Sequence, residues 1–106
     1  MLAVDYCSLC DYQTRRKMKT KESPEWQKII KMHPNWFSEP TLQFWNSEIY
    51  WDTLEPYGDG WKFISSEDNA TRTATRYTIR YVDEIAINDL SEFQEFATIA
   101  EAVRAL

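Results

Sequence analysis

The residues of this sequence that are best suited to chemistry are two cysteines and one histidine. Cys7 and Cys10 form a Cys-x-x-Cys pair, and His33 is the only histidine in the chain. Thiolates at this spacing bind zinc or form a redox pair. Structural zinc sites use four protein ligands, so a fourth would have to come from Asp5, Asp11 or another chain. We treat Cys7, Cys10 and His33 as the candidate metal ligands and expect no bound metal. The other interpretation is two reduced thiols that pack as small apolar groups.

The stretch YCSLCDYQTRRK resembles the first half of a C2H2 zinc finger, in which an aromatic residue precedes Cys-x-x-Cys and a basic helix follows. The resemblance implies zinc ligands at Cys7 and Cys10 and a nucleic-acid contact along the basic run Arg15–Lys21. The spacing of that family would place histidines near Ser23 and Gln27, and neither is a histidine. The resemblance is therefore limited to this stretch.

Motifs for catalysis are missing from the sequence. Paired carboxylates, which can act as general acid and base, occur at Glu67-Asp68 and Asp83-Glu84, but such pairs are common in acidic chains and are explained by solvation. The sequence contains no phosphate-binding loop, no G-x-S-x-G, no H-E-x-x-H and no dinucleotide fingerprint. Its only two glycines are too few for a glycine-rich cofactor cradle. We expect a non-enzymatic protein without a cofactor.

The remaining candidate for function is a surface within the aromatic segment Leu42–Asp68. Tyrosine and tryptophan side chains dominate the energetics of protein interfaces, and carboxylates beside them steer a basic partner. The residues proposed for partner binding are rings that alternation does not place in a core, with the carboxylates around them: Phe44, Tyr50, Asp52, Glu55, Tyr57 and Asp59.

We therefore expect a protein-interaction module that binds another protein through an aromatic and acidic surface. A short, acidic, aromatic-rich chain of this style is typical of small phage- or bacteria-encoded inhibitors and adaptors that bind a host protein. The alternative is a nucleic-acid-associated factor with a partial Cys-x-x-Cys metal knuckle and the basic run Arg15–Lys21. A third hypothesis is self-association through an exposed edge strand at Arg76–Asp83.

Composition and charge separate these hypotheses. The chain has 106 residues and a net charge of −5. The first 50 residues carry seven basic and six acidic side chains, whereas the remainder carries five basic and eleven acidic ones. This balance disfavours nucleic acid, because neutralising phosphates needs a basic surface. No apolar run is long enough to span a membrane and no secretory leader is recognisable, so we expect a cytoplasmic protein with reduced cysteines.

The elements that would position these residues are those of a single α+β domain over residues 1–106. Pro24 after Ser23, with Trp26, Ile29 and Ile30 on one face, predicts a helix over about 24–33. Period-two alternation around EPYGDG predicts a β-hairpin near 42–66, and RYTIRYVDE predicts a strand near 75–83. Two interpretations of the tail stay open. It is either one helix from Ser91 onward or a fourth strand near 92–97 followed by a helix over about 98–106, and we prefer the second.

Alternation also assigns the faces of the predicted sheet. In the hairpin, one face carries the core residues Trp45, Ile49, Trp51, Trp61 and Phe63, whereas Phe44 and Tyr50 lie on the other. In the third strand, Tyr77, Ile79 and Tyr81 point one way and Arg76, Thr78 and Arg80 the other. The sheet of three or four antiparallel strands would pack against the two helices.

Overall fold

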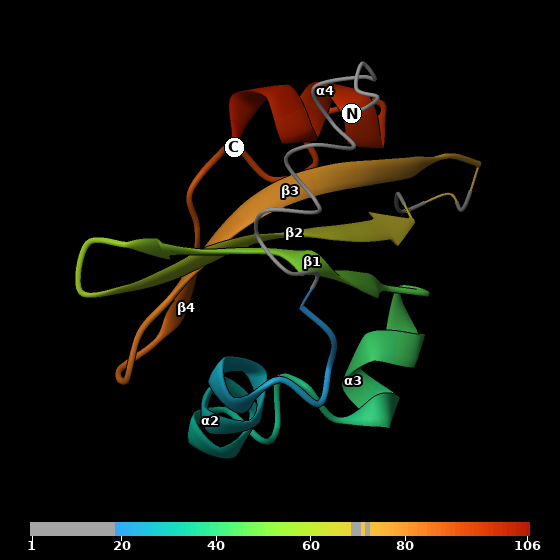
Figure 1. Cartoon of the computed structure of the whole chain (residues 1–106). Helices are drawn as coiled ribbons and strands as arrows, with labels where there is room; N and C mark the ends of the chain where they lie inside the picture. The colour runs from blue at the N-terminus through green and yellow to red at the C-terminus, as the bar shows by residue number, and fades with distance from the viewer. Residues whose placement is uncertain (1–18, 69–70, 72) are drawn as a thin grey trace, which may run out of the picture.

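The computed structural model describes residues 19–68, 71 and 73–106, and it has the α+β fold that the sequence predicts. Four antiparallel strands form one sheet in the order β1-β2-β3-β4 (Figure 1). The strands are β1 (Glu48–Tyr57), β2 (Gly60–Asp68), β3 (Thr75–Val82) and β4 (Ile87–Asp89). The helices are α2 (Pro24–Met32), α3 (Glu39–Phe44) and α4 (Ile99–Ala105). Helices α2 and α3 lie on one side of the sheet and α4 on the other (Figure 1). None of the described helices is long and apolar enough to cross a membrane.

The first face of the sheet packs against α2 through aromatic rings. Trp26 is fully buried, and its ring meets the rings of Phe37, Trp51 and Phe63 edge-on, with centroids 5.9, 4.8 and 5.1 Å away. Ile29 is also fully buried in this cluster, and Ile30 packs against it only in part. The predicted helix and its apolar face are therefore confirmed, with the helix ending at Met32 and His33 as its C-cap.

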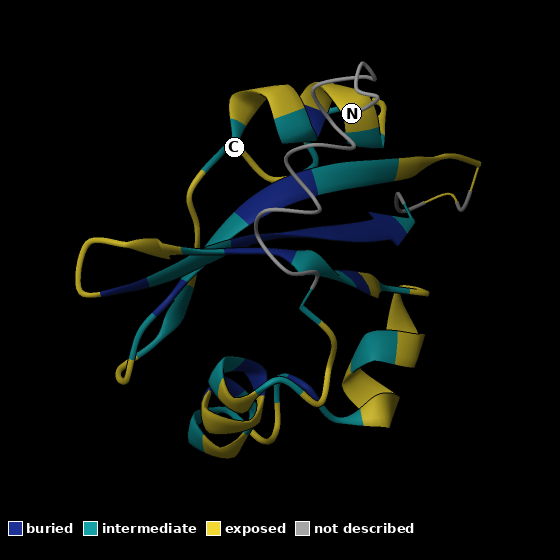
Figure 2. Ribbon diagram, in the orientation of Figure 1, coloured by how far each residue is buried: buried dark blue, intermediate teal, exposed yellow. Residues whose placement is uncertain are grey.

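The second face of the sheet packs against α4. Ile64, Ile79 and Ala102 form its buried centre, so β2 is buried from both sides and is dark blue over most of its length in Figure 2. A capping box begins this helix near the start that the sequence predicts: the Thr98 hydroxyl accepts a hydrogen bond from the Glu101 N–H, and the Glu101 carboxylate accepts one from the Thr98 N–H. Both groups satisfy N–H donors that an uncapped helix leaves unpaired.

The hairpin turn uses both glycines of the chain. Gly58 has a φ of +57°, the left-handed conformation that glycine adopts without strain. At Gly60, a Cβ atom would lie 2.1 Å from the carbonyl oxygen of Val82. This position therefore excludes every larger residue and keeps β2 and β3 close together at the tip of the hairpin.

A large bulge interrupts β1 between Tyr50 and Glu55. Tyr50 pairs with Ile64 and Glu55 pairs with Lys62. Between these two pairs, β1 advances by five residues and β2 by two. The hydroxyl of the buried Thr53 fills the gap: it accepts a hydrogen bond from the Ile64 N–H at 2.9 Å and donates one to the Tyr50 carbonyl at 2.6 Å. One side chain thus replaces the backbone partners that the bulge removes.

Two boundary predictions were wrong. The hairpin does not begin near residue 42, because Glu39–Phe44 forms helix α3 and β1 starts at Glu48. Ser38 as N-cap and Pro40 in the first turn start this helix, since proline has a φ suited to that position. Trp45 therefore lies outside β1 and is 40% exposed, so its assignment to the core was also wrong.

The fourth strand is Ile87–Asp89 and does not lie near 92–97. Within 92–97 the only ladder contact is an isolated bridge between Phe96 and Tyr77. Gln94 has a φ of +59°, which ends any extended run, and its N–H donates to the Thr78 hydroxyl at 2.7 Å. Because β4 covers one side of β3 and β2 the other, β3 is internal, and an exposed edge at Arg76–Asp83 was also a wrong prediction.

The Thr53 hydroxyl at the bulge gives a direct test of the fold. Thr53→Val keeps the shape and removes the hydroxyl, which leaves the buried N–H of Ile64 without a partner. We expect a loss of about 1–3 kcal/mol in the free energy of unfolding. Thr53→Ser is the control: it keeps the hydroxyl, and losing one methyl should cost about 0.8 kcal/mol. Urea unfolding measures both, and equal losses for the two variants would contradict the role of the hydroxyl.

Candidate partner-binding surface

Two turns meet at one end of the sheet and form the acidic end. The β1–β2 turn carries Asp59, and the β3–β4 turn carries Asp83, Glu84 and Ile85. The turns lie side by side because β2 and β3 pair up to their ends, with Trp61 opposite Val82 (Figure 1). The acidic end surrounds a hollow of about 330 Å³, lined by Lys28, Asp59, Trp61, Asp83, Glu84 and Ile85.

The Asp83 side chain fixes the β3–β4 turn. Its Oδ1 accepts hydrogen bonds from the N–H groups of Ile85 at 2.9 Å and Ala86 at 3.0 Å. The Ala86 and Ile85 N–H groups lower the pKa of the Asp83 carboxyl, because both bonds favour its ionised form. Partial desolvation raises the pKa of the neighbouring Tyr81 hydroxyl, and the carboxylates of Asp83 and Asp59 raise it further.

Helix α2 also holds this turn. The ring of His33 at the helix C-cap lies with Nε2 2.6 Å from the Asp83 carbonyl oxygen, a distance at which Nε2–H donates a hydrogen bond. The ammonium of Lys28 lies 5.6 Å from the centre of the Trp61 ring, within the range of a cation–π contact. The acidic end is therefore fixed from the helix side as well as from the sheet.

The acidic end exposes an apolar side chain beside several charges. Ile85 is 89% exposed at the tip of the turn. Among the residues that line the hollow, three carboxylates face one ammonium. The acidic end therefore combines an exposed aliphatic side chain with an excess of negative charge.

The structure divides the six predicted binding residues among three places. Asp59 lies in the acidic end. Tyr57 lies at the same hairpin tip, 44% exposed, with its ring 5.9 Å from that of Tyr81 and 5.0 Å from the Lys62 ammonium. Glu55 pairs across β1 and β2 with Lys62. Phe44 is 62% exposed and lies against Trp45 at the opposite end of the sheet, where the Trp45 carbonyl accepts from the Asp68 N–H.

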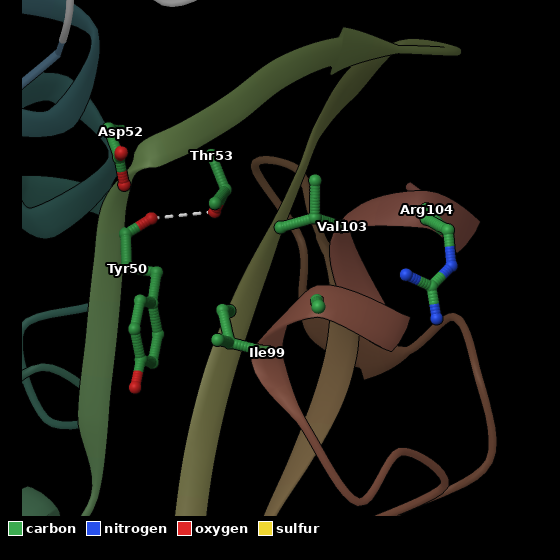
Figure 3. A pocket seen from close by; sticks show the side chains of 7 residues that line it. Tyr50, Asp52, Thr53, Ile99, Val103 and Arg104 are labelled. Carbon is green, nitrogen blue, oxygen red and sulfur yellow. Dashed lines mark hydrogen bonds between the residues drawn. The ribbon is translucent and has the colours of Figure 1, made fainter. Parts of the chain in front are cut away.

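The other two predicted residues, Tyr50 and Asp52, line a groove between β1 and α4. This β1–α4 groove has a volume of about 400 Å³ and is lined by Tyr50, Asp52, Thr53, Ile99, Ala100, Val103 and Arg104 (Figure 3). Burial raises the pKa of Tyr50, whose ring lies 5.9 Å from that of Tyr77. The groove and the acidic end are separate surfaces that share no residue.

The predicted metal site falls largely outside the described residues. Cys7 and Cys10 lie outside the described residues, and within residues 19–68, 71 and 73–106 no group of three His, Cys, Asp or Glu side chains could hold a metal ion. Of the basic run, Lys19 lies 3.7 Å from the Glu25 carboxylate and Lys21 lies 5.9 Å from the centre of the Trp51 ring.

A second charged cluster, which is buried at Glu67, largely buried at Arg80 and exposed at Asp89, is absent from the sequence-based prediction. The Arg80 guanidinium contacts the Glu67 carboxylate at 2.8 Å and that of Asp89 at 2.5 Å. It also lies 5.5 Å from the ring centres of Trp36 and Phe93. Through Trp36 and Phe93, this cluster connects the segments before α3 and α4 to the sheet. Because its charged groups contact one another, we assign it a structural role.

Five residues line the acidic end but are absent from the predicted binding residues: Lys28, Trp61, Asp83, Glu84 and Ile85. The pair Asp83-Glu84 was visible in the sequence but was attributed to solvation. A usable signal was its position directly after a strongly alternating strand, which places it in a turn.

Comparison with known proteins gives a family for this fold. Residues 25–106 match the model of a family of unknown function, DUF7447. The chain belongs to the DUF7447 family. No curated protein and no solved structure matches it. The DUF7447 match contains the acidic end and the β1–α4 groove, whereas Cys7, Cys10 and the run Arg15–Lys21 precede it.

The Asp83 carboxylate predicts a pH dependence of stability. Its pKa is lowered on folding, so its contribution is complete above the ordinary aspartate pKa of about 3.9 and is lost as the pH falls through the folded-state pKa. Asp83→Asn keeps an oxygen that accepts both N–H groups but cannot ionise. We expect the wild type to be the more stable protein at neutral pH, and the difference to shrink below about pH 4.

Urea unfolding of both proteins at a series of pH values measures this difference. All other carboxyls are common to the two proteins and cancel in the comparison. A difference in unfolding free energy that stays constant from neutral pH to strong acid would contradict the assignment.

Proposed function

We propose that this DUF7447 domain is a non-enzymatic protein-interaction module that binds a basic partner through its acidic end. The observation that carries the proposal is Ile85, 89% exposed on a turn whose conformation is fixed by Asp83 and surrounded by carboxylates. A partner that covers Ile85 would remove this aliphatic side chain from water, which favours the complex.

The proposed division of labour follows from the chemistry of each group. Ile85 serves as the apolar anchor, and Asp59 and Glu84 attract basic side chains of the partner and speed its encounter. Lys28, held over the Trp61 ring, offers one positive charge that fixes the orientation of the partner. In the cytoplasm, a module of this kind acts as an inhibitor or adaptor by covering a basic surface of another protein.

The nucleic-acid alternative receives no support from the described residues. Its cysteines and basic run lie before residue 25, outside the DUF7447 match. The carboxylates of the acidic end repel phosphate, so this surface disfavours nucleic acid.

A matched pair of variants tests the proposal. Asp59→Asn with Glu84→Gln and Ile85→Ser removes two charges and the anchor from the acidic end and leaves Asp83 to hold the turn. Glu39→Gln with Glu92→Gln removes two charges from exposed positions elsewhere. Tagged wild type and both variants are used to capture proteins from the native cell, and each captured protein is then titrated against all three.

We expect a partner of basic surface that the control variant retains and the acidic-end variant binds at least about tenfold more weakly, since losing a buried isoleucine alone removes about 1.5–3 kcal/mol. Salt should weaken the complex of the wild type, because exposed charges are screened. A partner that binds the acidic-end variant as tightly as the wild type would contradict the proposal.

A further inference from the structure

The β1–α4 groove has the properties of a second binding site, independent of the acidic end. Its floor is apolar, formed by the side chains of Ile99, Ala100 and Val103 from α4 and the ring of Tyr50 from β1 (Figure 3). Its volume of about 400 Å³ lies within the range of sites that bind small groups. The bulge in β1 supplies Asp52 and Thr53 to its other side.

The groove carries one charge of each sign on opposite sides. Asp52 lies on β1, and Arg104 lies across the groove on α4 (Figure 3). Neither side chain makes an ion pair with any residue in the described part of the chain. Arg104 in the last turn of α4 also suits the helix dipole, but the dipole does not account for Asp52.

The edge of β1 beside the groove is unsuited to adding a strand. The Tyr50 carbonyl accepts from the Thr53 hydroxyl, and the Trp51 carbonyl accepts from the Trp26 indole N–H at 2.7 Å. Pro56 has no N–H to donate. Recognition in the groove must therefore use side chains of the ligand rather than its backbone.

We propose that the β1–α4 groove binds a peptide segment through one apolar side chain, with a basic residue on one side of it directed to Asp52 and an acidic residue on the other directed to Arg104. The apolar side chain covers Ile99 and Val103 and gains most from burial. The flanking charges select the segment, because an acidic residue beside Asp52 or a basic residue beside Arg104 would be repelled.

Three blocked peptides test the selection. Each has a leucine flanked through glycine spacers by two charged residues: lysine and glutamate, two lysines, or two glutamates. They are titrated into the isotope-labelled full chain, and the backbone shifts of Thr53, Ile99, Ala100 and Val103 are followed. We expect the mixed-charge peptide to bind the wild type best, with a Kd of about 1 mM, and replacing its leucine by serine to weaken binding about tenfold.

Charge reversal on the protein supplies the specific readout. Arg104→Glu should shift the preference to the peptide with two lysines, and Asp52→Lys to the peptide with two glutamates. Ala100→Trp, at an exposed position on α4, should fill the groove and abolish binding of all three. The Asp59→Asn, Glu84→Gln, Ile85→Ser variant should bind the peptides as the wild type does.

Equal binding of all three peptides, preferences that ignore the reversals, or no shift of the groove residues with any peptide would each overturn the proposal. The outcome is separate from that of the acidic end, because the two sets of variants share no residue.

Discussion

The packing of Trp26 is the interaction on which the rest of the described structure depends. Its ring is fully buried among Phe37, Trp51 and Phe63, and its N–H donates to the Trp51 carbonyl within the bulge of β1. The Trp26 side chain therefore joins α2 to the sheet. It also gives a hydrogen-bond donor to the Trp51 carbonyl, which lies in the bulge of β1. Because α2 is fixed in this way, His33 at its end reaches the Asp83 carbonyl and Lys28 reaches the Trp61 ring. The position of the acidic end thus follows from the core.

Helices cover both faces of the sheet, so the binding surfaces that we propose lie at its end and along its edge. The aromatic cluster under α2 occupies one face and the Ile64, Ile79 and Ala102 cluster under α4 occupies the other. Of the hairpin rings, Phe63 is fully buried, and Trp51 and Trp61 are partly buried against the same cluster. We propose two surfaces for partners: the turns at one end of the sheet, and the groove between β1 and α4 beside the bulge. The first has an excess of negative charge, and the second has one charge of each sign.

Helices and strands were predicted correctly where their helix-start residues or their alternation lie within a few residues of one another in the sequence. Helix α2 follows from Ser23 and Pro24, α4 from the Thr98 capping box, and β3 from its strict alternation. Helix α3 was missed because its last residues were assigned to the hairpin near 42–66, although Ser38 and Pro40 form a helix start. The bulge was also missed, since it depends on the Thr53 hydroxyl meeting an N–H on another strand, which no local pattern contains.

The same distinction applies to the candidate surfaces. Asp59, Tyr50 and Asp52 were selected from sequence and line the two hollows, but nothing in the sequence separates them into different sites. Ile85 was missed because its place beside Asp59 depends on the pairing of β2 with β3, and Arg104 was missed because its place in the groove depends on the packing of α4 on the sheet. Phe44 was assigned to the face of a strand, and its actual place on α3 lies at the end of the sheet away from the acidic turns.

The most direct measurement for the central claim is photo-crosslinking of the full chain in its native cell. One protein carries a photoreactive amino acid in place of Ile85, and a matched protein carries it in place of Phe44, which is also exposed. We expect a discrete adduct with a basic protein from position 85, weakened by salt, and no such adduct from position 44. An adduct formed only from position 44, or from neither position, would contradict it.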